Sequence, residues 1–250
     1  MDSIAIVCAL KDEASVCIAQ ELKKIGVPAW AAYYEFDYDT VFLPLEKVKE
    51  KTIIVLSKHA SAAGKKSLTV HSLGNFSKAE YGGEEKKLCP TNPSICASYL
   101  KALDKKKTEN KLDDFVVCLE VTHHGPYVEK EVVFIELGSS ISEWTNSSLA
   151  KLVAQVVIES TNTTHEGKKF IGLGGIHYAS EFTKLVLREN YLPGHLCPAY
   201  ALANIDENML SQMIQKSGAS EIVLDWKGLK QEKQRIISLC EKTGLPIKRV

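Results

Sequence analysis

The chain has 250 residues and a mass of 27.6 kDa, which is long enough to bury a full hydrophobic core without disulfides or a partner subunit. Apolar residues make up 45% and charged residues 25%, a globular composition that excludes long disorder and fibrous repeats. Lys and Arg balance Asp and Glu at 31 each, so a molecule-wide basic field that binds any nucleic acid is excluded, although a local basic patch is not.

Short runs of β-branched residues alternate with amphipathic helical patterns along the chain. In the first half, we expect strands at residues 4–10, 52–56, 67–71, 115–121 and 132–137. Helices are expected at residues 12–25 and 93–103. The charged run at residues 105–111 is most simply a solvated surface loop.

In the second half, Ser140 and Glu143 match a capping box, and the apolar residues between 149 and 157 repeat at the spacing of a long core-facing helix. Further strands are expected at 169–173 and 221–225, and further helices near 182–186, 206–216 and 229–243. This alternation predicts an α/β fold: a single domain over residues 1–250 with a central mixed, largely parallel sheet flanked by helices.

The compartment is indicated by the N-terminus and the cysteines. The first apolar run has no basic segment before it and is too short for a signal peptide, and no later run approaches the ~18 apolar residues of a membrane span. The seven cysteines are an odd number without a Cys-x-x-Cys pair, which is typical of a reduced protein. We therefore expect a cytoplasmic monomer without membrane contact, in which cysteine is a poor candidate for metal ligand or nucleophile.

Most histidines and two glutamates fall near the C-terminal ends of predicted strands. They are His59, His71, His123, His124, His177, Glu120 and Glu136. Because sites in α/β sheets form beyond the carboxyl ends of strands, we expect these side chains to converge on one edge of the sheet. Imidazole and carboxylate are the ligands of zinc when thiolates are absent, so the pattern predicts a metal or acid–base site. Taken singly, each histidine is as simply a capped loop residue, and Glu120 a partner of a neighbouring lysine.

The sharpest local motif is Thr122-His-His-Gly-Pro126. Adjacent side chains on an extended chain point opposite ways, so only one of the two histidines is expected to bind a given ion directly. The other would hold a second ion, carry a proton or cap the strand. Gly125 and Pro126 then form a rigid exit from the strand.

Two glycine-bearing loops are candidates for ligand binding. Residues 172–177 lack the third glycine of a dinucleotide fingerprint and indicate either close backbone approach to a ligand or an ordinary strand–helix turn. Residues 71–83 combine an amide, two aromatic rings and backbone donors, which suits a nucleotide base or, as simply, a surface loop. Lysines in the same stretch are candidates for phosphate contacts or form a solvated face; they are Lys58, Lys65, Lys66, Lys78, Lys86 and Lys87.

Seven short motifs together carry a family resemblance. In chain order they are Ser57-Lys-His59, Leu68-Thr-Val-His71, Gly74-Asn-Phe76, Ala79-Glu-Tyr-Gly-Gly83, Glu120-Val-Thr-His-His-Gly-Pro126, Phe134-Ile-Glu-Leu-Gly-Ser-Ser140 with Trp144, and Gly172-Leu-Gly-Gly-Ile-His-Tyr178. The set resembles the archaeal and plant type of D-aminoacyl-tRNA deacylase. The resemblance implies zinc-dependent hydrolysis of the ester between a D-amino acid and tRNA in translation quality control, two Zn²⁺ per subunit, and a fold similar to peptidyl-tRNA hydrolase and nucleoside phosphorylase.

Roles follow for the candidate residues as expectations. The expected zinc ligands are His59, His123, Glu136 and His177. Expected catalytic residues are Glu120, as general base or as a carboxylate that orients an imidazole, together with His71 and His124. The acceptor end of the tRNA is expected to contact Lys65, Lys66, Asn75, Phe76, Tyr81, Gly82, Gly83 and Tyr178 through phosphate binding, hydrogen bonds and base stacking.

Two other functions compete with this one. The first is a metal-dependent hydrolase or phosphorylase-like enzyme of a small nucleoside or amino-acid derivative, with the same metal site but no use for the lysines. The second is an RNA-binding module in which the histidines hold a structural zinc, which requires four closed ligands. Serine-hydrolase, zincin and NTPase functions lose their main support, because no Gly-x-Ser-x-Gly, His-Glu-x-x-His or Walker A motif is present.

Overall fold

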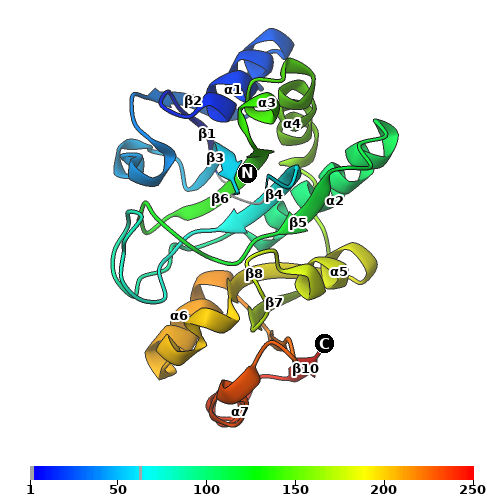
Figure 1. The fold of residues 1–250 in the computed structure, drawn as a ribbon. Coiled ribbons are helices and arrows are strands. Elements are labelled where there is room, and N and C mark those ends of the chain that lie inside the picture. The colour runs from blue at the N-terminus through cyan, green and yellow to red at the C-terminus, as the bar shows by residue number, and fades with distance from the viewer. Residues whose placement is uncertain (1–2, 62–63) are drawn as a thin grey trace.

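A computed structural model describes residues 3–61 and 64–250 of the chain. Its larger sheet has six strands in the order β2-β1-β3-β6-β4-β5 (Figure 1). They are β1 (Ile4–Ala9), β2 (Ala31–Phe36), β3 (Thr52–Ala60), β4 (Ser67–Ser72), β5 (Val116–Leu119) and β6 (Glu131–Ser139). β1, β2, β3 and β6 are parallel, whereas β4 runs antiparallel to β6 and pairs in parallel with β5. The predicted mixed, largely parallel α/β sheet is confirmed.

A second sheet was not expected from the sequence. It is parallel, with the order β10-β9-β7-β8, and its strands are β7 (Lys168–Leu173), β8 (Tyr191–Cys197), β9 (Glu221–Leu224) and β10 (Ile247–Arg249). β8 escaped prediction because Pro193 and Gly194 interrupt it, and both residues ordinarily argue against a strand. Gly194 is required there, since a Cβ atom would meet the Ser217 Oγ at 2.2 Å.

Seven α-helices are described. They are α1 (Glu13–Ile25), α2 (Pro93–Glu109), α3 (Ile141–Trp144), α4 (Ser147–Ser160), α5 (Ser180–Arg188), α6 (Glu207–Ser217) and α7 (Lys233–Glu241). The capping box of Ser140 and Glu143 is confirmed at the start of α3. The prediction of a loop at residues 105–111 is wrong, because α2 continues to Glu109. Lysine and glutamate are good helix formers, and Lys105 pairs with Glu109 at 3.7 Å on a solvated helix face.

The two faces of the six-stranded sheet differ in what covers them. Leu68, Val70 and Leu137 point to the face covered by α1, α2 and α4, where the largest core cluster lies. Ile53 and Phe134 point to the other face, where residues from the 43–48 segment cover the start of the strands. Further along this second face the apolar pattern gives way to polar side chains, which mark the candidate site.

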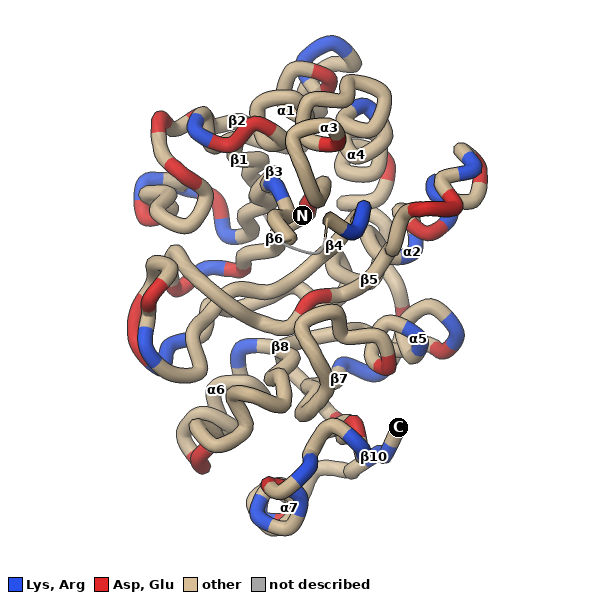
Figure 2. Tube along the Cα trace, in the orientation of Figure 1, with Lys and Arg blue, Asp and Glu red and all other residues tan. Residues whose placement is uncertain are grey.

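The surface carries charges of both signs along the helices and loops (Figure 2), in keeping with the balanced composition. Within the described residues, no helix combines the length and the apolar character required to cross a membrane.

Candidate metal centre

The strand register brings Glu136 between two histidines. Glu136 on β6 lies opposite Ser57 on β3 and Thr69 on β4, so these three side chains share one face of the sheet. His59 lies two residues further along β3, beside Gly138, and His71 two residues further along β4, beside Phe134. Because β3 and β4 run in opposite directions relative to β6, the two imidazoles flank Glu136 from opposite sides.

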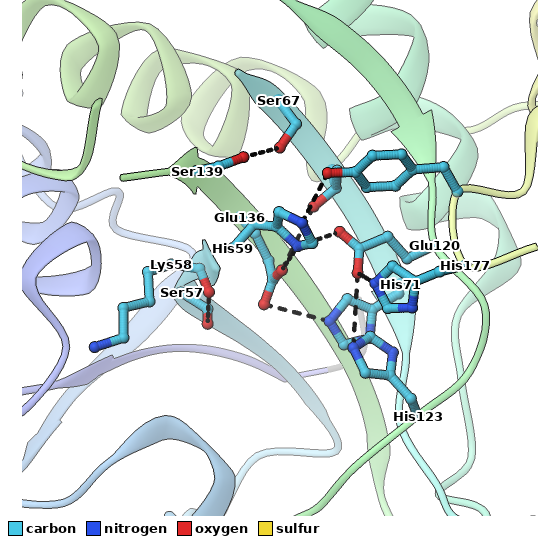
Figure 3. A network of polar contacts seen from close by, with 12 residues as sticks. Ser57, Lys58, His59, Ser67, His71, Glu120, His123, Glu136, Ser139 and His177 are labelled. Carbon is cyan, nitrogen blue, oxygen red and sulfur yellow. Dashed lines mark hydrogen bonds and ion pairs between the residues drawn. The ribbon is translucent and has the colours of Figure 1, made fainter. Parts of the chain in front are cut away.

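The expectation of a site at one edge of the sheet is therefore wrong in position. The carboxyl ends of β3 and β4 point in opposite directions, because β4 is antiparallel to β6. The side chains nevertheless converge, since they lie in neighbouring rows on one face of the sheet and are joined there by the segments that follow β5 and β7 (Figure 3).

Glu136 contacts both flanking imidazoles. One of its carboxylate oxygens lies 3.4 Å from the His59 Nδ1 and the other 3.4 Å from the His71 Nε2. All three side chains are buried. The carboxylate thus spans the gap between the two histidines.

Glu120 follows β5 and occupies the centre of a second group (Figure 3). Its two oxygens lie 2.8 Å from the His59 Nδ1 and from the His177 Nε2, and one of them lies 3.6 Å from the His123 Nε2. Neither of these oxygens has a well-directed hydrogen bond to a described residue. The same holds for the His71 Nε2. Short separations without hydrogen-bond alignment leave buried oxygen and nitrogen lone pairs that a cation could satisfy.

Three histidines are oriented by the backbone. The Nδ1 atoms of His71, His123 and His124 lie 3.2, 2.8 and 2.6 Å from the carbonyl oxygens of Ser72, Val121 and Gly125. A ring that donates its Nδ1 proton to a carbonyl keeps the Nε2 lone pair available. This second contact is the usual support of a metal-binding histidine.

Among the described residues, the potential ligand atoms form three groups. One of them consists of His71, Glu120 and Glu136 and shares a residue with each of the other two. Those two have no residue in common. One is His59, Glu120 and His177, and the other is His71, His123 and His124, with ligand atoms within 4.8 Å of one another in each. Glu136 joins them, because its two oxygens reach His59 and His71 respectively. The clustered imidazoles and carboxylates are therefore a candidate metal site.

Burial and neighbouring charge set the ionisation of the histidine group. Burial, followed by the imidazoles of His71 and His124, lowers the pKa of His123 well below its usual range. Burial and His71 lower the pKa of His124 to about 4. Both rings are therefore neutral near pH 7, which is the form that binds metal.

Neighbouring imidazoles lower the pKa of both carboxylates, which therefore favour their charged form. Burial alone would raise the pKa of Glu136, but His71 and His59 together lower it to about 2. Burial likewise works against protonation of His59, yet its contacts with Glu120 and Glu136 raise the pKa of that imidazole to about 11. Two buried carboxylates thus require positive charge beside them, which is what a divalent cation supplies.

His59 is held in place by side chains from three other parts of the chain. The Tyr178 hydroxyl lies 2.8 Å from its Nε2, and the Trp144 indole Nε1 donates to its carbonyl oxygen at 3.0 Å. The amide of the preceding Lys58 donates to the buried Asp12 carboxylate at 3.0 Å. This support leaves the Nδ1 of His59 facing Glu120 and Glu136.

A cavity of about 520 Å³ opens onto these groups. Five of the seven clustered residues line it, namely His59, His123, His124, Glu136 and His177. Its volume lies within the range of roughly 300–1,000 Å³ that is usual for small-molecule sites. The cluster is therefore accessible from solvent, unlike a closed structural metal site.

Only some of the residues expected to contact the tRNA line the cavity. Asn75, Phe76 and Tyr81 line the cavity, whereas Lys65 and Lys66 are not among the described residues that line it. Lys66 pairs instead with Asp114 at 2.8 Å, beyond the far end of β4 from His71.

Five of these residues have structural contacts that compete with the expected roles. The Asn75 Nδ2 donates to the carbonyl oxygens of Gly82 and Glu84, at 2.9 and 3.3 Å, rather than facing a reacting oxygen. Phe76 is buried in the core of the smaller sheet, and the hydroxyl of Tyr178 is engaged with His59. The Gly82-Gly83 backbone packs against Gly125, where a Cβ atom would meet the Gly83 nitrogen at 2.1 Å.

Sequence reasoning missed other residues of the cavity. Tyr200 lines its rim, in a 3-10 helix (Ala199–Asn204) that follows β8, and Thr40 and Val41 line it from a 3-10 helix (Thr40–Phe42) after β2. No motif marks them in the sequence. They follow β2 and β8, two strands that the sequence pattern does not predict.

Comparison with known proteins gives consistent relatives. A sequence profile of the family described as D-aminoacyl-tRNA deacylase matches residues 46–248. The D-aminoacyl-tRNA deacylase of Methanocaldococcus jannaschii is 35% identical over 258 aligned positions, which cover 98% of each chain. That of Methanococcus vannielii is 37% identical over 207 positions, covering 79% of this chain and 81% of the relative. That of Cenarchaeum symbiosum is 34% identical over 197 positions, covering 78% and 76%.

The fold also has a solved counterpart. The crystal structure of a conserved protein of unknown function, AF0625, superposes with a TM-score of 0.92, and the match covers 99% of this chain and 95% of the other. Sequence identity is 24%, so this likeness shows the fold alone.

Proposed function

Because the chain belongs to the D-aminoacyl-tRNA deacylase family, we propose that it hydrolyses the ester between a D-amino acid and the terminal ribose of tRNA, with zinc bound at the His/Glu cluster. One observation carries the proposal. Two groups of potential ligands, bridged by Glu136, lie at the floor of a solvent-accessible cavity. Ester hydrolysis requires such access, because both water and the ester must reach the same point.

The donor set fits zinc. Two ligands on one tetrahedral Zn²⁺ lie about 3.3 Å apart, since zinc–nitrogen and zinc–oxygen distances are near 2.0–2.2 Å. The contacts of Glu136 with His59 and His71, 3.4 Å each, are close to this value, whereas Glu120 lies 2.8 Å from His59 and from His177 and would have to move away from both rings to share an ion with them. The buried lone pairs of Glu120 and His71 without a hydrogen-bond partner among the described residues are consistent with a cation between them.

We assign the ligands by these groups. One ion would be held by His59, Glu120 and His177, and the second by His71, His123 and His124. Glu136 would lie between the two ions. This assignment moves Glu120 from the expected general base to a ligand, because it is fully buried and both oxygens face imidazole nitrogens. Each group offers three ligands, the number typical of catalytic zinc sites, and Glu136 offers one further oxygen on each side.

Zinc in such a site polarises a carbonyl oxygen and lowers the pKa of water to near 7. In the reaction, the acyl carbon gains an oxygen from water, its bond to the ribose oxygen breaks, and that ribose oxygen takes up a proton. Three imidazoles contact Glu120, and His177 is the most exposed of them, with 41% of its side chain accessible. We therefore also assign His177 a role in orienting the ester.

A structural-zinc RNA module fits the geometry less well. Such a module needs ligands closed off from solvent, whereas five of the seven clustered residues line an open cavity. We also propose that the chain is a single catalytic domain and acts as a monomer in the cytoplasm.

The test is a deacylation assay on D-tyrosyl-tRNA and L-tyrosyl-tRNA in parallel, with and without a chelator. We expect rapid release of D-tyrosine, little release of L-tyrosine, loss of activity with chelator and its return with Zn²⁺. Full activity after the metal content has been shown to be zero would contradict the metal assignment. Equal rates on both enantiomers would contradict the assigned substrate.

A further inference from the structure

From the exposed rings at the cavity rim, we propose that Tyr81 and Tyr200 form a stacking site for the unpaired terminal adenosine of the tRNA. This inference rests on the proposed function, because it places the nucleoside that carries the ester. The two residues lie 119 positions apart in the chain, yet both line the same cavity as the histidine cluster.

Exposure sets these two tyrosines apart. Each is 70% accessible, although both border a cavity whose floor is buried. Single exposed aromatic residues are ordinary on protein surfaces. Two of them lining one cavity are better explained by a planar ligand, since stacking on aromatic side chains is a common way of binding unpaired bases.

The backbone of each tyrosine is fixed to a segment that carries clustered histidines. The Tyr81 carbonyl accepts a hydrogen bond from the Gly125 amide at 3.0 Å, directly after His123 and His124. The Ala199 amide, next to Tyr200, donates to the Gly175 carbonyl at 2.9 Å, two residues before His177. The rings are therefore free to contact a base while their positions relative to the metal site are held, which lowers the entropic cost of binding.

The volume of the cavity favours an unpaired end of the tRNA over a base-paired stem. A volume of about 520 Å³ suits one nucleoside with its amino acid and is too small for a base-paired stem. Since the ester is attached to the terminal ribose, its base must lie near the rim when the acyl carbon lies at the floor. Lys78 also lines the cavity and is suitably charged for the adjoining phosphate, whereas Lys58, which lines it too, is paired with Glu13 at 2.8 Å.

The experiment compares alanine and phenylalanine substitutions on substrates with and without a base. Tyr81→Ala and Tyr200→Ala should each lower kcat/KM for D-tyrosyl-tRNA by about 5- to 150-fold, the value expected for loss of one stacking contact. Tyr81→Phe and Tyr200→Phe should retain activity, because the ring remains. All four variants should cleave D-tyrosine ethyl ester, which has no base, at the unmodified rate.

Tyr38→Ala is the matched control, because Tyr38 is an exposed tyrosine that is not among the described residues lining the cavity. Unchanged cleavage of D-tyrosyl-tRNA by both alanine variants would overturn the proposal. Equal losses on the ethyl ester would also overturn it, since the tyrosines would then act on the metal site or the fold.

A binding measurement separates this proposal from the proposed function. If the unmodified chain cleaves no D-aminoacyl-tRNA, the proposed function fails, but titration of the zinc-loaded protein with adenosine still decides on the tyrosines. Saturable binding that is lost in Tyr81→Ala and Tyr200→Ala and kept in the phenylalanine variants supports the stacking site. No binding by the unmodified chain, or equal binding by all variants, refutes it.

Discussion

At the scale of single residues, the structure changes the role of Tyr178. The sequence places it beside His177, at the tip of a glycine-bearing loop, where stacking on a base is a reasonable expectation. Its hydroxyl instead lies 2.8 Å from the His59 Nε2, on the side of the ring that faces away from Glu120 and Glu136. Tyr178 is thus in position to orient His59, one of the proposed metal ligands.

Removal of this hydroxyl should weaken metal binding. We expect Tyr178→Phe to lower zinc affinity by about 10- to 100-fold, the usual cost of losing a partner of a ligating histidine. The measurement is competition with a chromophoric chelator, and Tyr38→Phe is the control because that ring is exposed and away from the cluster. Unchanged zinc affinity together with a lower rate on D-tyrosyl-tRNA would restore the stacking role to Tyr178.

At the scale of elements, the predictions succeeded where periodicity was long and failed where strands are short or interrupted. The strands bearing His59, His71 and Glu136 were predicted, and so were the residue types of the cluster. The antiparallel direction of β4 was not, because direction depends on tertiary pairing that has no local signal. β8 was not predicted because Pro193 interrupts its pattern. The contacts between the smaller sheet and the histidine-bearing segment were therefore not predicted either.

That missed strand carries His195, which joins the two parts of the molecule. His195 is fully buried, with Nδ1 3.1 Å from the Thr122 Oγ1 and Nε2 2.9 Å from the Cys89 carbonyl oxygen. Burial lowers its pKa to about 4. Since Thr122 precedes His123, this ring positions the segment that supplies two of the proposed ligands.

The depressed pKa of His195 predicts a pH dependence of stability. Between pH 6.5 and about 4 the unfolded chain binds a proton at this residue and the folded chain does not, so the free energy of unfolding falls as pH falls. The loss should reach roughly 3 kcal/mol at pH 4. Urea unfolding of the chelator-treated protein and of His195→Gln, at pH 7 and pH 4, measures it. Parallel pH profiles for the two proteins would rule out the contribution of His195.

At the scale of the whole molecule, the proposed metal site links the two sheets. His59, His71 and Glu136 come from the six-stranded sheet, whereas His177 follows β7 of the smaller one. A ligand that binds the folded state alone stabilises it by RT ln(1 + [L]/Kd), or about 4 kcal/mol at a concentration 1,000 times Kd. Zinc should therefore raise the stability of both sheets together rather than that of one.

Urea unfolding with and without Zn²⁺ tests this linkage. His177→Ala removes the ligand that the smaller sheet supplies, so the stabilisation by zinc should shrink to less than half of that in the unmodified chain, by about 2 kcal/mol or more. His165→Ala is the matched control, because His165 lies in the loop after α4 and outside the clustered groups. The expected reading is a zinc-dependent shift of the Trp226 fluorescence transition, since Trp226 follows β9 in the smaller sheet. If zinc stabilises the unmodified chain and His177→Ala equally, His177 is not a ligand, and the ion is held by the larger sheet alone.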